Sequence, residues 1–174
     1  MIQNVESFVK YFDGIRRRTL TFVRAIPADR IDWSPQAGEF TLGDLVRHIA
    51  AIEQITVYAV VHDRWKAYPG HGSSLAVDLE QVIAYLEATH AEAVGLLQTL
   101  PDGELQQPRT SLAKRPLKAW RLLMSIVEHE VHHRSQIASY LETLGQIPPQ
   151  IFGLGVDDVA SISANLAREG IDGE

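Results

Sequence analysis

Apolar residues recur every three to four positions along most of the chain, which is the spacing of one face of an α-helix. This pattern predicts four long amphipathic helices over residues 2–26, 42–65, 76–100 and 116–144, and a short terminal helix over residues 157–168. Alternation with a period of two, which would predict strands, is nearly absent. Four helices of similar length pack most simply as a four-helix bundle, so we expect an all-α fold with a short C-terminal extra helix.

Local signals mark where these helices begin and end. Thr41 followed by Asp44 resembles a capping box at the start of the second helix. Pro116 suits the first turn of the fourth helix, where a missing N–H costs nothing, and Gly145 is a natural residue just past its end. Residues 104–115 lack periodicity and predict a polar connector.

Composition narrows the class of protein. The 174 residues are 45% hydrophobic and 22% charged, with no internal repeat, so we expect one globular domain over residues 1–174. A net charge of −6 argues against nucleic acid or anionic lipid as the partner. No apolar run of membrane-spanning length occurs, and acidic residues interrupt any N-terminal signal pattern, so we expect a soluble, cytoplasmic protein with no membrane partner. The absence of cysteine excludes disulfides, zinc fingers and thiolate nucleophiles from the chain itself.

Two histidines carry the clearest candidate chemistry. His129 and His133 are four residues apart on the predicted fourth helix, so their rings lie one above the other on one face. The same face continues through Ile126 and Ile137, which points the pair into the bundle. Two imidazoles in this arrangement can reach a single metal ion at about 2.0–2.1 Å each.

A third histidine repeats the pattern on the second helix. His48 lies between Leu45 and Ile52 on an apolar stripe, and facing helices would bring it opposite the pair. Three neutral imidazoles would bind one divalent metal and leave coordination positions open, which is typical of a catalytic site. Burying them without a shared ligand would leave donors and acceptors unsatisfied at roughly 1–3 kcal/mol each. We therefore predict His48, His129 and His133 as metal ligands.

The remaining histidines and a basic triplet receive weaker interpretations. His90 is the rival third ligand, although a satisfied, half-buried histidine is the favoured interpretation there. His132 is predicted to face solvent or a neighbouring helix, and no role is assigned to His62 or His71. Residues 16–18 (Arg-Arg-Arg) are predicted to form a solvated face, with anion binding as the minor alternative.

Residues 129–133 also match H-E-x-x-H, the signature of zinc metalloproteases, in which Glu130 would be the general base. The predicted absence of strands and the lack of a suitable third ligand argue against it. Glu142, the downstream carboxylate, is nine residues past His133 and about 13 Å away by helical rise. An i, i+4 ion pair between Glu130 and Arg134 is the simpler interpretation.

Three stretches resemble the DinB/YfiT-like family of metal-binding four-helix bundles. The first is Trp33-Ser34-Pro35 followed by residues 40–49 (FTLGDLVRHI). The second is residues 129–137 (HEVHHRSQI), and the third is residues 140–145 (YLETLG) running into Pro148-Pro149. Together with the helix layout they span nearly the whole chain. Ser135 departs from the family, which often has glycine at this position.

The resemblance implies a divalent metal held by three histidines, at the positions of His48, His129 and His133. Nickel or zinc is the first expectation, with iron or manganese as alternatives. It also implies a homodimer and a cytoplasmic location. Some relatives are thiol-dependent S-transferases or isomerases that use bacillithiol or mycothiol, and others are stress-inducible proteins without an assigned reaction.

The leading hypothesis is therefore a metal-dependent enzyme of the thiol S-transferase type, which activates a low-molecular-weight thiol or water for attack on a small-molecule substrate. Gln136 and Tyr140 follow His133 by three and seven residues and are the predicted cofactor-binding residues. The alternative interpretation is that both pack between helices with one satisfied polar tip. A second hypothesis is a non-catalytic metal-binding stress protein, with coordination closed by Glu53, Asp44 or His90. A third is a metal-dependent hydrolase with a nearby carboxylate as base.

Overall fold

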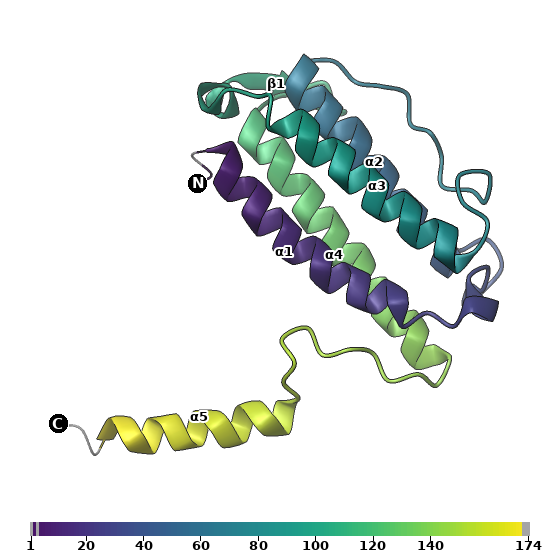
Figure 1. The fold of residues 1–174 in the computed structure, drawn as a ribbon, viewed down its shortest axis with the longest axis vertical. Helices are drawn as coiled ribbons and strands as arrows, with labels where there is room; N and C mark the ends of the chain where they lie inside the picture. Colours follow the sequence, from purple (N-terminus) through teal and green to yellow (C-terminus); the bar gives the residue numbers. More distant parts are fainter. Residues whose placement is uncertain (1, 3, 172–174) are drawn as a thin grey trace.

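Four long helices lie side by side in the computed structural model, which describes residue 2 and residues 4–171 (Figure 1). The helices are α1 (Val5–Arg24), α2 (Leu42–His62), α3 (Leu79–Leu97) and α4 (Ala119–Thr143). They form a four-helix bundle, so the predicted all-α fold class is confirmed.

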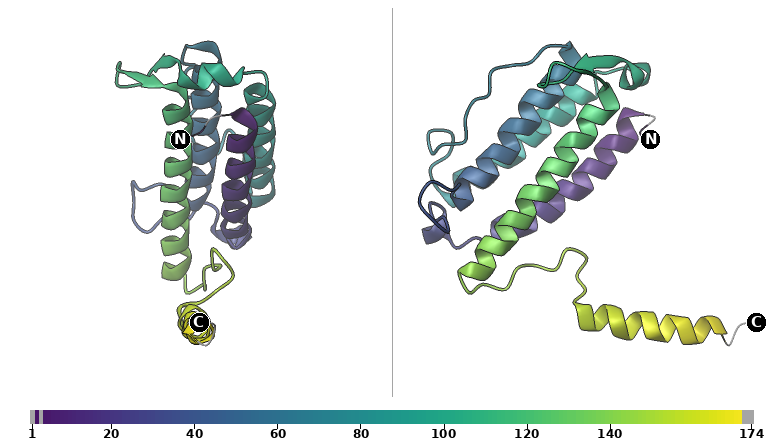
Figure 2. Two further views of the ribbon diagram at one scale, coloured as in Figure 1. Left: turned by 90° about the vertical axis from the view of Figure 1, so that its left-hand side faces the viewer. Right: turned by 180° about the vertical axis from the view of Figure 1, so that it is seen from behind.

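The order of the helices around the bundle differs from their order in the chain. Both α1 and α2 pack against α3 and α4, so α1 lies diagonally from α2, and α3 lies diagonally from α4 (Figure 2). Two connectors, residues 25–41 and 98–118, therefore cross from one corner of the bundle to the opposite corner. This topology places α2 directly beside α4, which brings together segments about 80 residues apart in the sequence.

Apolar side chains from all four helices fill the bundle in two clusters. Phe8 and Phe12 of α1 pack with Leu123 of α4 in the first cluster, and all three are almost completely buried. The second cluster contains Leu45 of α2 and Ile137 of α4, on the faces that the apolar spacing predicted. Full burial of one such side chain stabilises the fold by about 1.5–3 kcal/mol.

The predicted capping box at the start of α2 is present. The backbone N–H of Asp44 donates to Thr41 Oγ1 at 3.0 Å, and the backbone N–H of Thr41 donates to Asp44 Oδ2 at 3.0 Å. Two orphan donors of the first turn are thus satisfied, which defines where α2 begins and sets the phase of the helix that carries His48.

The connector before α4 differs from the prediction. It contains a short 3₁₀ helix, η2 (Asp102–Gln106), and two antiparallel strands, β1 (Pro108–Thr110) and β2 (Pro116–Lys118). Pro116 is therefore a strand residue, and α4 begins three residues later. The hairpin is held by contacts that no periodicity records: Arg109 Nε donates to the carbonyl of Val60 at 2.7 Å.

The first connector contains a second 3₁₀ helix, η1 (Ala28–Arg30). The last helix of the described residues is α5 (Val156–Ile171), which extends the predicted terminal helix at both ends. Figure 1 shows α5 apart from the bundle, beyond an extended linker. Its side chains are exposed from Val156 to Arg168. No helix in the described part of the chain combines the length and apolarity needed to span a membrane.

Candidate metal centre

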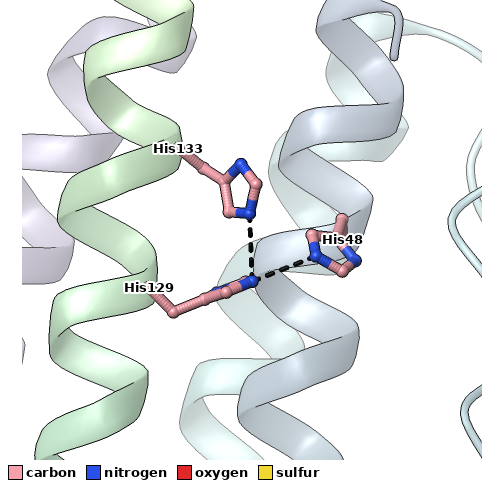
Figure 3. Close-up of side chains that lie close together, drawn as sticks. All are labelled: His48, His129 and His133. Atoms are coloured by element: carbon pink, nitrogen blue, oxygen red, sulfur yellow. Dashed lines mark hydrogen bonds between the residues drawn. The ribbon is translucent and has the colours of Figure 1, made fainter. Parts of the chain in front are cut away.

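Three histidine side chains meet between α2 and α4 (Figure 3). His129 Nε2 lies 3.0 Å from His48 Nε2 and 3.0 Å from His133 Nε2. One ring nitrogen from each residue lies within 4.8 Å of the other two, and all three side chains are half-buried. The helical spacing on α4 stacks His129 and His133 on one face, and the packing of α2 against α4 places His48 opposite them.

The three imidazoles are held neutral by their surroundings. Burial, with the neighbouring His133 and His71, lowers the pKa of His48 to about 4. Burial, His133 and His48 lower the pKa of His129 to about 3. Burial also lowers the pKa of His133, and the hydrogen bond to Gln136 offsets only part of that effect. Neutral imidazole is the form that binds metal ions, so the cluster presents ligands that need not lose a proton at pH 7.

Neighbouring side chains orient two of the rings. The carbonyl oxygen of Gln136 can only accept, so His133 Nδ1, 2.5 Å away, donates to it and leaves a lone pair on Nε2. His48 Nδ1 lies 2.7 Å from Tyr68 Oη, which lies 3.1 Å from His71 Nδ1. When the Tyr68 hydroxyl donates a hydrogen bond to His71 Nδ1, its oxygen can accept a hydrogen bond from the Nδ1–H group of His48. The lone pair of the His48 ring is then on Nε2.

The donor set fits a divalent metal. The lone pairs on His48 Nε2 and His133 Nε2 both point toward His129 Nε2. A single proton on His129 Nε2 could donate a hydrogen bond to only one of these two lone pairs. The Nε2 atom of His129 is 3.0 Å from the Nε2 atoms of both His48 and His133, which is close enough for one divalent ion to be shared by these nitrogens. His48, His129 and His133 are the residues that would hold the ion.

The acidic residues and the histidine considered as a fourth ligand are engaged elsewhere. Asp44 caps α2 and accepts from Arg47 Nη2 at 2.8 Å. Glu53 accepts from Arg16, and His90 bridges Glu53 and Asp13. Among the described residues, the cluster of candidate ligands contains the three histidines and no carboxylate. A metal in this cluster would keep positions for exogenous ligands, which is typical of catalytic sites.

Next to the histidines, a buried ionic network crosses the bundle. Arg16 of α1 donates to Glu53 of α2 at 2.7 Å and to Glu130 of α4 at 2.8 Å, and the exposed fraction of all three side chains is 2% or less. Burial lowers the pKa of Arg16, but the two carboxylates outweigh this effect and raise it above its ordinary value. Two predictions are therefore wrong: Arg16 is not solvated, and Glu130 pairs with Arg16 instead of Arg134.

The third helix joins the same network through His90. His90 Nδ1 lies 2.7 Å from Glu53 Oε1, and His90 Nε2 lies 2.9 Å from Asp13 Oδ1. This arrangement matches the favoured interpretation of His90 as a satisfied, half-buried histidine. The network thus contains a side chain from each of the four bundle helices, and it binds α2 to α4 close to the three histidines.

The predicted cofactor-binding residues lie on the histidine face of α4. Gln136 contacts His133 directly, whereas Tyr140 packs edge-on against Trp33, with ring centroids 5.7 Å apart. Sequence reasoning missed the loop residues beside His48. Phe40 stacks on His71 at 4.3 Å between ring centroids and packs edge-on against His48 at 5.3 Å. The sequence offered one indication of this contact, an aromatic residue (Phe40) before α2 and a histidine (His71) after it. Loops have no periodicity, so the sequence does not show which of their side chains meet.

The fold and this cluster define the class of protein: a four-helix bundle with a three-histidine centre between two neighbouring helices, α2 and α4. The family model of the DinB family matches residues 1–167 of the chain. The chain therefore belongs to the DinB family, which confirms the resemblance noted in the sequence.

Solved structures of similar fold agree with this assignment. A DinB-like protein from Bacillus cereus ATCC 10987 superposes with a TM-score of 0.71 at 19% identity, over 86% of this chain and 99% of that one. The DinB-like protein YjoA from Bacillus subtilis gives 0.67 at 17% identity, over 83% and 96%. YfiT from Bacillus subtilis gives 0.67 at 17% identity, over 82% and 88%, and is described as a probable metal-dependent hydrolase with an unusual four-helix bundle topology. Among curated proteins, none matches this chain.

Proposed function

We propose that this DinB-family protein is a metal-dependent enzyme in which His48, His129 and His133 hold one divalent ion and a low-molecular-weight thiol is the activated nucleophile. The observation that carries the proposal is the convergence of three neutral imidazole nitrogens without a protein carboxylate in the cluster. A divalent ion supplies Lewis acidity, which lowers the pKa of a thiol or water bound to it.

The residues around the centre have defined tasks in this proposal. Gln136 and Tyr68 fix the ring orientations of His133 and His48 through their Nδ1 atoms. Tyr68 and His71 form a chain of hydrogen bonds from His48 toward the loop, along which a proton can move between Tyr68 Oη and His71 Nδ1. Phe40 covers one side of His48 and His71, which limits the access of water from that side.

A thiol is favoured over water because a hydrolytic centre usually employs a nearby carboxylate as general base. Glu130, which directly follows His129 on α4, is buried against Arg16 and is not available as a base. Glu128, which directly precedes His129, pairs with Arg121. A free thiol has a pKa of about 8.5, far below that of water at about 15.7, so a thiol would need less help from a base to ionise at this site. The chain contains no cysteine, so the sulfur has to come from a cofactor.

The first test measures the metal content of the full-length, untagged protein by mass spectrometry, because added histidines would bind metal themselves. We expect close to one ion per chain in the wild type and a sharp loss in His48→Ala and His133→Ala. His62→Ala is the matched control, since His62 is an exposed histidine at the other end of α2. Metal retained by His48→Ala would contradict the assignment of ligands.

The second test distinguishes the reaction. Metal-loaded protein is mixed with bacillithiol or mycothiol and with 1-chloro-2,4-dinitrobenzene, and formation of the thioether is followed by absorbance. The sulfur displaces chloride, and the thiol proton goes to the buffer. We expect turnover that disappears with chelator and thermal stabilisation by the thiol but not by its S-methyl derivative. Absence of both effects in protein that retains its metal would overturn the thiol proposal and leave the metal site intact.

Hydrolysis is the second candidate, favoured by the description of the structural neighbour YfiT as a probable metal-dependent hydrolase. It predicts that a simple ester or amide is hydrolysed by metal-loaded protein without any thiol, and that chelator abolishes the activity. A non-catalytic role would instead show metal binding with neither activity.

Two further expectations accompany the proposal. A homodimer predicts twice the monomer mass, 19.4 kDa per chain, in light scattering. A cytoplasmic location predicts that the protein fractionates with cytoplasmic markers. Both remain predictions.

A further inference from the structure

A cavity lies on the face of α4 that is turned away from the three histidines. Its α4 residues include Val131, Ser135 and Ala138, and with about 3.6 residues per turn these project roughly opposite to His129 and His133. The cavity has a volume of about 370 Å³. Its walls come from α1, α4 and the linker after α4, and its apolar lining is Phe22, Val131, Ala138, Pro148, Pro149 and Ile151.

Arg134 lines this cavity, and one nitrogen of its guanidinium is buried without a hydrogen-bond partner among the described residues. The side chain is only 6% exposed, and its Nη1 atom has no hydrogen-bond partner among the residues that the structure describes. Glu130 lies one turn away, but its two carboxylate oxygens accept from Arg16 at 2.8 and 3.1 Å. The guanidinium is instead 6.0 Å from the centroid of the Phe22 ring. A buried charge in this state is costly, and an anion would relieve the cost.

We propose that this cavity binds a small monocarboxylate with an apolar body, with the carboxylate on Arg134 and Ser135. Nothing in the metal centre is needed for this binding, so the proposal stands independently of the function proposed above.

The chemistry of the walls selects this class of ligand. A guanidinium presents a planar fork of donors that matches the two oxygens of a carboxylate, and Ser135, which also lines the cavity, adds a hydroxyl donor. The apolar lining suits a hydrocarbon or aromatic body. The volume is at the lower end of the range of about 300–1,000 Å³ for small-molecule pockets, which fits a small acid.

The far end of the cavity excludes a second negative charge. Glu142 also lines it, eight residues from Arg134 and so about 12 Å away along α4. A dicarboxylate long enough to reach Glu142 would meet its carboxylate, and a ligand with one anionic end and an apolar end would not. The site therefore favours a monocarboxylate.

The test is isothermal titration calorimetry of the full-length, untagged protein with sodium hexanoate, and with hexanamide as the uncharged analogue of the same shape. Arg134→Met removes the charge and keeps most of the side-chain volume. Arg121→Met is the matched control, because it removes the same charge from α4 at a half-exposed pair with Glu128. Ala138→Phe fills the cavity without changing a charge and serves as an independent variant.

We expect the wild type and Arg121→Met to bind hexanoate with equal affinity and hexanamide at least tenfold more weakly. Arg134→Met should lower the hexanoate affinity at least tenfold, and Ala138→Phe should abolish it. Treatment with chelator should leave binding unchanged, which separates this cavity from a carboxylate bound at the metal centre.

The proposal is overturned by several results. For the wild type, these results are no binding of hexanoate, equal affinity for hexanamide, or hexanoate binding that disappears with chelator. For the variants, the result is wild-type affinity for hexanoate in Arg134→Met or in Ala138→Phe. Thermal unfolding adds a further check. Arg134→Met should melt no lower than Arg121→Met, because it removes a buried nitrogen that has no hydrogen-bond partner among the described residues. A markedly lower melting temperature would show that Arg134 has a structural partner, which contradicts the premise.

Discussion

Arg16 and Glu130 form a two-point contact across the interior of the bundle, in which Nε donates to Oε1 at 3.1 Å and Nη2 donates to Oε2 at 2.8 Å. Glu130 directly follows His129, and the same guanidinium also holds Glu53 of α2. The contact therefore connects α1 to both helices that carry the candidate metal ligands. Its charges are nearly inaccessible to water, so each partner depends on the others for compensation.

Replacement of Arg16 tests this dependence. Arg16→Met leaves two carboxylates buried without a cation, and we expect the free energy of unfolding to fall by about 3–5 kcal/mol. Arg17→Met, an exposed neighbour on the same helix, should change it by no more than about 0.5 kcal/mol. Urea unfolding followed by circular dichroism measures both values. Similar losses in the two variants would show that the buried pairs do not stabilise the fold.

The stability of the bundle should depend on the protonation of His90. Burial lowers the pKa of His90, but the hydrogen bond to Glu53 and the charge of Glu53 outweigh it, so the pKa is raised above 6.5. The folded state therefore binds the proton more tightly than the unfolded state. The resulting stabilisation is complete below the unfolded pKa and disappears as pH rises through the folded pKa.

The measurement compares wild type and His90→Gln by urea unfolding across pH 5.5 to 9. The difference isolates His90, because the other titrating groups are common to both proteins. We expect the difference in free energy of unfolding between wild type and His90→Gln to shrink as pH rises from about 6.5 upward. A difference in free energy of unfolding that stays constant or grows with pH would contradict the raised pKa of His90.

Gln136 should control metal affinity without touching the metal. Its carbonyl oxygen accepts from His133 Nδ1 and so directs the Nε2 lone pair of His133 toward the cluster. Loss of such a partner typically weakens metal binding about 10- to 100-fold, and we expect this for Gln136→Leu. Gln146→Leu, an exposed glutamine after α4, is the control. Competition with a chromophoric chelator measures the dissociation constants, and equal values in both variants would rule out the orienting role.

Tyr68 should act in the same way on His48, with a smaller effect. Tyr68→Phe keeps the ring beside His48 and removes only Oη. Because Tyr68 is 40% exposed, water can replace part of the lost hydrogen bond, so we expect a loss in metal affinity of about tenfold, the low end of the range. Tyr58→Phe on α2 is the control. Unchanged affinity in Tyr68→Phe would show that another group orients His48.

Much of the architecture follows from the sequence because it is local. The apolar stripe of each helix is set by its own spacing, and residues predicted to face inward, such as Phe12 and Ile137, are buried. The capping box of Thr41 and Asp44 depends on three adjacent positions, and it forms as predicted. The stacking of His129 and His133 likewise requires only that residues 129–133 are helical.

The choice of partners between distant segments was decided by the tertiary structure. Periodicity shows which face of a helix is apolar, but it does not show which helices are neighbours and which are diagonal. Arg16 was predicted to be solvated because a charge run is usually exposed; burial became tolerable only when α2 and α4 supplied two carboxylates. Tyr68 and His71 lie in a loop, where position depends on the chain ends it connects. The helices and their apolar faces can be predicted from short stretches of sequence, because both are short-range properties of the chain. Contacts between charged, proton-sharing or metal-binding side chains on different helices depend on how the bundle packs.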